Sequence, residues 1–207
     1  YTTKPGESGV RVVDTVTNRS DEPGQMQLLY HINLGTPLVD PGSKLVAPVA
    51  KIAPRSAGEW EKIATWDTYH PETPGAEGVC FFAKLLAGAD GWTRALLHNA
   101  AATRGFSVKY NTTQLPCFTQ WKNAQTAADG YVTGLEPAVN YPNERPFEEA
   151  KGRVLTLAPG ESRNFEFALE AHGDAKTVAA AKQEVAALQA GQQPEVLADP
   201  DPDWSMP

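Results

Sequence analysis

Turn-forming residues divide this chain into short segments, which limits the regular elements that it can form. The 207 residues include 17 glycines and 17 prolines, and most segments between them alternate apolar and polar side chains. Alternation with a period of two is typical of half-buried β-strands. We therefore predict an all-β fold, an antiparallel β-sandwich. The predicted strands cover residues 10–18, 26–34, 45–52, 78–86, 93–98, 105–110, 117–121, 131–136, 152–157 and 162–171.

The pattern changes near the C-terminus. Apolar residues there recur at helical spacing, at Val178, Ala181, Val185 and Leu188. Asp174 is a suitable N-cap and Gly191 a suitable stop, so we predict one amphipathic helix over 173–191, packed on the edge of a sheet. Residues 192–207 contain four prolines and several acids, which favours an extended or disordered tail. The sandwich then occupies residues 1–172.

One long stretch shows no strand pattern. Residues 54–76 contain three prolines and two glycines, and the stretch is too long for a tight hairpin. We predict a large loop there, with a turn of helix near residues 57–63. Long loops in compact domains are often functional. A second, proline-rich loop is predicted over 137–146.

Composition restricts the partners. The net charge of -7 argues against nonspecific binding to nucleic acid or to an anionic membrane. No apolar run approaches the roughly 20 residues of a membrane span. Cys80 and Cys117 lie within apolar segments, which favours buried free thiols over a disulfide, and they lack zinc-site spacing. We expect no metal or other cofactor, and a cytoplasmic location.

The start of the chain is unusual. Residues 1–7 begin with Tyr1 rather than methionine and lack the charged-then-apolar pattern of a signal peptide. A strand is predicted to follow almost at once. We therefore expect the C-terminal part of a longer domain, in which an upstream segment or a second chain completes the sandwich.

Two ionisable side chains stand out because each lies in an apolar, strand-like run. His31 lies within 28–34 and Glu136 within 134–139. A histidine and a burial-shifted carboxylate make a working acid–base pair near neutral pH. The alternatives are a hydrogen-bonded core histidine and a strand-end glutamate that points to solvent or pairs with an arginine.

The segments around these residues resemble the galactose mutarotase (aldose 1-epimerase) superfamily. Asp-Thr-Val-Thr-Asn at 14–18 leads into Leu-Leu-Tyr-His-Ile-Asn-Leu at 28–34, and Leu-Glu at 135–136 precedes Asn-Tyr-Pro at 140–142. The chain is most similar to bacterial aldose-1-epimerase family proteins of unknown function. Three further segments carry that similarity: 53–55, 115–122 and 134–137. The similarity covers nearly the whole chain up to about residue 170.

The resemblance implies a reaction on a monosaccharide or a sugar derivative. Glu136 would take the proton of the anomeric hydroxyl, and His31 would protonate the ring oxygen. The ring then opens, the aldehyde rotates and closure gives the other anomer. We expect the two side chains to approach one another across a concave face, with room for a sugar ring between their tips.

The family pattern also suggests substrate-binding residues, with departures. Superfamily enzymes hold sugar hydroxyls with an aspartate on a strand that would align near 78–86, which has no acid here, so Glu77 or Asp67 would have to substitute. Trp121 is a candidate stacking surface, and Lys122 and Arg55 are candidate donors. Trp121 is as readily a core residue, and Arg55 as readily a surface salt bridge.

Two other functions fit the same fold. An isomerase or lyase would use the pair to move a proton at the carbon next to a carbonyl. A non-catalytic carbohydrate-binding module would bind sugar without turnover. Fold resemblance fixes the architecture better than the reaction.

Overall fold

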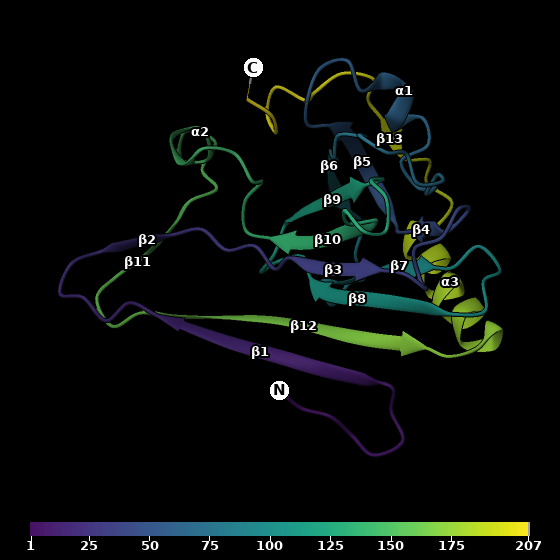
Figure 1. The fold of residues 1–207 in the computed structure, drawn as a ribbon. Coiled ribbons are helices and arrows are strands. Elements are labelled where there is room, and N and C mark those ends of the chain that lie inside the picture. The colour runs from purple at the N-terminus through teal and green to yellow at the C-terminus, as the bar shows by residue number, and fades with distance from the viewer. Residues whose placement is uncertain (207) are drawn as a thin grey trace.

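Two packed sheets form the body of the chain in the computed structural model, which describes residues 1–206 (Figure 1). The five-stranded sheet has the order β1 (Gly9–Thr17), β12 (Ser162–His172), β8 (Gly105–Asn111), β7 (Trp92–His98) and β4 (Lys44–Val46). The six-stranded sheet has the order β13 (Glu195–Val196), β5 (Val49–Pro54), β6 (Val79–Leu85), β9 (Cys117–Asn123), β10 (Val132–Ala138) and β3 (Ile32–Gly35). All pairings are antiparallel except β13 with β5. The predicted antiparallel β-sandwich is confirmed.

Apolar side chains from both sheets fill the space between them. Phe81, Phe118 and Leu135 come from the six-stranded sheet, and Val108 and Phe165 come from the other; all are at most 1% exposed. Burial of such side chains is the main favourable term in folding. The core therefore uses one face of each strand, and the opposite faces are partly covered by α3 on one sheet and by a smaller apolar cluster around Phe82 on the other.

Two predicted strands are divided in the structure. The segment 26–34 forms the end of β2 (Gly24–Met26), which pairs with β11 (Leu155–Leu157) in a separate ribbon, and then β3 in the six-stranded sheet. The segment 45–52 divides around Pro48 into β4 and β5, which belong to different sheets. Proline has no backbone N–H for a sheet ladder, which suits it to this crossing point.

The predicted strands 152–157 and 162–171 do not pair with each other. β11 pairs with β2, whereas β12 pairs with β1 and β8. Figure 1 shows the β2–β11 ribbon extending from one end of the sandwich. Alternation along each strand was thus predicted, but the partner of each strand depends on contacts distant in sequence.

The predicted C-terminal helix is present as α3 (Ala175–Gln189). The Asp174 carboxylate accepts a hydrogen bond from Thr177 N at 2.8 Å, as expected of an N-cap. Val178, Ala181 and Val185 form its buried face. Two short helices accompany it: α1 (Trp60–Ile63), within the predicted turn, and α2 (Arg145–Ala150), which was not predicted. None of the helices in the described residues combines the length and apolar character that a membrane span requires.

The tail after α3 lies against the six-stranded sheet over its described length. β13 pairs in parallel with β5, and Leu197 N donates to Ile52 O at 2.9 Å. Farther along, the Trp204 ring packs on Tyr141 with centroids 5.3 Å apart. The tail is therefore extended and docked rather than disordered.

Candidate active site on the outer face of the six-stranded sheet

The candidate site lies on the face of the six-stranded sheet that points away from the core. Successive side chains along a strand point to opposite faces. Phe81, Phe118 and Leu135 point into the core. Their neighbours in the chain therefore point outward, and these are Cys80, Thr119 and Glu136.

His31 and Glu136 meet on this outer face. His31 directly precedes β3, in which Ile32 pairs with Leu135, so the next position brings His31 opposite Glu136. The His31 Nε2 atom lies 3.0 Å from Glu136 Oε1. The His31 side chain is 45% exposed and the Glu136 side chain only 4% exposed. A ligand can thus reach the imidazole from solvent, while the carboxylate lies in the wall behind it.

The spacing corrects one expectation. A separation of 3.0 Å leaves no room for a sugar ring between the tips of His31 and Glu136. A ring would have to lie over the pair instead. That arrangement still suits ring opening, because the anomeric hydroxyl and the ring oxygen are bonded to the same carbon and can be reached from one side.

Burial gives Glu136 the properties of a base that works near neutral pH. Loss of hydration raises the pKa of its carboxyl from 4.5 to about 7. Among the described residues, Oε1 has no hydrogen-bond partner, because its contact with His31 lacks hydrogen-bond geometry. Thr119 lies opposite Glu136, and its buried Oγ1 is likewise without a partner there. Such atoms mark places where water or a ligand hydroxyl is expected.

Gly134 provides the space in which the pair meets. Its backbone does not have a positive φ, so glycine is not required for conformation. A Cβ atom at this position would lie 2.9 Å from His31 Cε1 and closer still to Glu136 Oε1. Both contacts are inside van der Waals range, so any side chain at 134 would displace His31 or Glu136.

Trp121 and Arg55 extend the site across the sheet. Trp121 pairs with Gly134 on one side and Cys80 on the other, and Arg55 N donates to Cys80 O at 2.9 Å. The indole meets the His31 ring at an edge, with centroids 5.9 Å apart. Its partly exposed position on the outer face argues against the alternative that Trp121 is a core residue.

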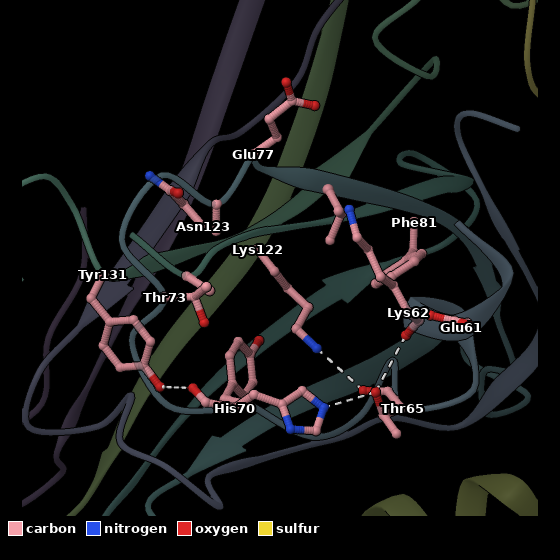
Figure 2. Close-up of a pocket in the computed structure, with 14 residues that line it drawn as sticks. Glu61, Lys62, Thr65, His70, Thr73, Glu77, Phe81, Lys122, Asn123 and Tyr131 are labelled. Atoms are coloured by element: carbon pink, nitrogen blue, oxygen red, sulfur yellow. Dashed lines mark hydrogen bonds between the residues drawn. The ribbon is translucent and has the colours of Figure 1, made fainter. Parts of the chain in front are cut away.

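Lys122 lies on the opposite face of β9 from Trp121. Its Nζ donates to the carbonyls of Thr65, Trp66 and Thr68 at 3.2, 3.3 and 2.6 Å, within the long loop. Lys122 lines a cavity of about 390 Å³ whose lining includes neither His31 nor Glu136. Figure 2 shows the lysine among the residues around this cavity. The structure does not bring Lys122 to the candidate site. Instead, it anchors the loop 54–76 to the sheet.

The two acids considered as substitutes for the family aspartate are also elsewhere. Glu77 lines the same cavity as Lys122 (Figure 2). Asp67 forms an ion pair with Lys44 at 3.2 Å. Neither acid joins His31 and Glu136, so of the five suggested substrate-binding residues only Arg55 and Trp121 lie on the face of the pair.

The loop anchor leads to a stability prediction. Replacing Lys122 with methionine should lower the free energy of unfolding by about 1–3 kcal/mol, because three backbone carbonyls lose a hydrogen bond from a buried charge. Chemical denaturation measures this change. Lys62→Met is the control, since Lys62 is an exposed lysine of the same loop and should change stability by less than about 0.5 kcal/mol. Equal effects in the two variants would contradict the anchoring role.

Sequence reasoning missed Gly134, Thr119 and Cys80 as parts of the site. The alternation of faces along each strand could have indicated them, because each of these residues faces outward and the next residue of its strand faces the core. Cys80 and Cys117 are both free thiols, as the sequence favoured. Burial raises the pKa of Cys80 to about 11, so it is a neutral thiol near pH 7.

Comparison with known proteins identifies the family. A family model described as a domain of unknown function, DUF4432, matches residues 1–171. This chain is a DUF4432 protein. The match contains the His31–Glu136 pair and ends just before α3, so the helix and the docked tail lie outside the matched residues. No match was found among curated proteins.

Solved structures place this DUF4432 protein among mutarotase-like folds. A Klebsiella pneumoniae protein provisionally named an aldose 1-epimerase superimposes with a TM-score of 0.90 and 34% identity, over 93% of this chain and 50% of its own. A galactose mutarotase related enzyme from Lactobacillus acidophilus superimposes with a TM-score of 0.55 and 16% identity, over 81% of this chain and 58% of its own. A galactose mutarotase-like protein from Clostridium acetobutylicum superimposes with a TM-score of 0.53 and 15% identity, over 80% of this chain and 53% of its own. The chain thus spans half the length of the Klebsiella protein.

Proposed function

We propose that this DUF4432 chain carries the acid–base pair of an aldose 1-epimerase type of reaction, which interconverts the anomers of a sugar. The observation that carries the proposal is the 3.0 Å contact between the half-exposed His31 and the buried Glu136. The name given to the Klebsiella protein supports the same reaction class. The proposal concerns the whole protein, of which this chain supplies the pair.

The proposed steps move two protons. Glu136 takes the proton of the anomeric hydroxyl as the bond between the anomeric carbon and the ring oxygen breaks, and His31 gives a proton to that ring oxygen. The open-chain aldehyde then rotates, and the reverse transfers close the ring on its other face. A general acid or base in this position typically contributes about 100- to 10,000-fold to the rate.

The pH dependence of the reaction tests the assignment of the base. The pKa of Glu136 is raised to about 7 by burial, and a base must be ionised to act. We expect kcat/KM to rise with pH up to about 7 and to fall about tenfold for each pH unit well below that value. Saturation-transfer NMR between the two anomers of an aldose, corrected for the spontaneous reaction, measures this profile. A flat profile from pH 5 to 8 would contradict Glu136 as the base.

The same experiment separates the other reactions on this fold. Run in D2O, an isomerase or lyase would exchange the hydrogen at the carbon next to the carbonyl for deuterium. Anomer interconversion leaves that hydrogen in place. Deuterium incorporation without anomer exchange would therefore reject the epimerase proposal.

The free edge of the five-stranded sheet is a candidate site for a partner segment. β1 lies at the edge of the five-stranded sheet, and its Val13 is 49% exposed although it is apolar. Only the isolated bridge between Thr2 and Arg11 covers its free side among the described residues. We propose that an upstream segment or a second chain packs there and completes the sandwich.

A further inference from the structure

A second cavity in the structure is built from segments distant in sequence. The cavity measures about 720 Å³. Arg55 and the residues after it, at the head of the long loop, form one wall. The end of the tail, including Pro202 and Ser205, forms another. Neither His31 nor Glu136 lines this cavity.

Arg55 supplies positive charge to the cavity. Its side chain is exposed and makes no ion pair with another described residue. Its charge acts on the Cys80 thiol, on which the charge of Glu136 also acts, so the thiol lies near both groups. The guanidinium thus contacts the Cys80 thiol and lies near the Glu59 carboxylate, and it keeps further N–H donors for a ligand on the same side of the sheet as Glu136.

The wall opposite Arg55 is held in place. Lys51 forms an ion pair with Asp201 at 2.5 Å, and Asn143 Nδ2 donates to Trp204 O at 2.8 Å. Ser205 N donates to Asp201 O at 2.8 Å. The Ser205 side chain is 2% exposed, and its Oγ has no hydrogen-bond partner among the described residues. A fixed wall with a buried, unpaired hydroxyl thus borders the cavity that Arg55 also lines.

The position of the cavity relates it to the His31–Glu136 pair. Arg55, Cys80, Trp121 and Gly134 lie in one row across β5, β6, β9 and β10. Adjacent strands are about 4.8 Å apart, so the backbones of β5 and β10 are roughly 14 Å apart. A sugar ring that lies over Trp121, with its anomeric carbon at Glu136, directs its far end along this row toward Arg55.

We propose that this cavity is a subsite for an anionic group, a carboxylate or a phosphate, on the end of the sugar remote from the anomeric carbon. The inference rests on the proposed function for the orientation of the ring. Arginine binds both groups through paired N–H donors. Glu144 also lines the cavity and is exposed, as Arg55 is, so the two charges act in opposite directions on a bound anion. The substrate class is then an acidic aldose, a uronic acid or an aldose phosphate.

The test compares three sugars of the same stereochemistry: glucose, glucuronate and glucose 6-phosphate. The full-length protein should show kcat/KM for anomer exchange at least about tenfold higher with one of the charged sugars than with glucose. The Arg55→Met variant should lose this preference, because its kcat/KM falls more with the charged sugar than with glucose. Whichever charged sugar is preferred distinguishes a carboxylate from a phosphate. Arg104→Met, which removes an exposed charge from another part of the chain, should leave the preference intact.

Each outcome decides. Equal rates with all three sugars, or an equal change of all three in Arg55→Met, would overturn the subsite. If the wild-type protein turned over none of the three sugars, the proposed function would be rejected. Binding of the three sugars, measured by protein NMR, would then test the subsite independently of turnover. Tighter binding of a charged sugar that disappears in Arg55→Met would support it, and binding that ignores charge would overturn it.

Discussion

Replacing Glu136 with glutamine should lower kcat for anomer exchange by at least about 100-fold and leave the folded protein at least as stable at pH 8. The amide keeps the shape of the side chain but cannot take a proton. The base acts mainly in the transition state, so sugar affinity should change little. Saturation-transfer NMR gives the rate, and sugar titration gives the affinity.

The stability of this variant has a definite sign. The pKa of Glu136 is about 7 when folded and 4.5 ordinarily, so the folded chain holds this proton more tightly than the unfolded chain. Stability therefore falls as pH rises from about 4.5 to 7, by on the order of 3 kcal/mol. Glutamine cannot ionise and avoids this cost. A large loss of stability at pH 8, or a rate within a fewfold of wild type, would show that the carboxylate has a structural role instead.

A methyl group at position 134 should be nearly as damaging to turnover. In Gly134→Ala the new Cβ atom would crowd both His31 Cε1 and Glu136 Oε1, so the two side chains must move apart. Misplacement of about 1 Å can cost about 100-fold in rate, and we expect a loss of that size in kcat. The free energy of unfolding should fall by about 1–3 kcal/mol, as overpacking usually does.

Gly35→Ala is a matched control. Gly35 lies in the neighbouring strand β3, and a Cβ atom there would meet only Tyr131 O, at an ordinary 3.5 Å. We expect turnover within about twofold of wild type. If Gly134→Ala behaved in the same way, the close approach of His31 and Glu136 would not be needed for the reaction.

The sequence was sufficient for features governed by local pattern. Alternation predicted the strand on which Phe165, Phe167 and Leu169 share a face, and Asp174 marked the start of α3. Glu136 was recognisable because a carboxylate in an apolar strand is costly unless it is paired or used. These features depend on residues a few positions apart, so one sequence contains them.

Features set by distant contacts could not be predicted. Asp67 and Glu77 were suggested because they lie near the right strand, but the sheet places them away from Glu136. Lys122 was grouped with Trp121, although adjacent residues of a strand face opposite sides. Docking of the tail depends on Lys51 and Tyr141, which lie far from it in sequence. Proline and acid content therefore indicated an extended or disordered tail but could not show the contacts that dock it.

On the central strands, one of two neighbouring residues packs in the core and the other lies on the face of the candidate site. Leu135 fills the core while Glu136 serves the site, and Phe81 and Cys80 are divided in the same way. A substitution on the outer face therefore leaves the packing between the sheets untouched. Such a scaffold can acquire a new substrate preference by changes at single outward positions, without a compensating change in its interior. Evolution can thus retain the architecture while the chemistry on its surface diverges.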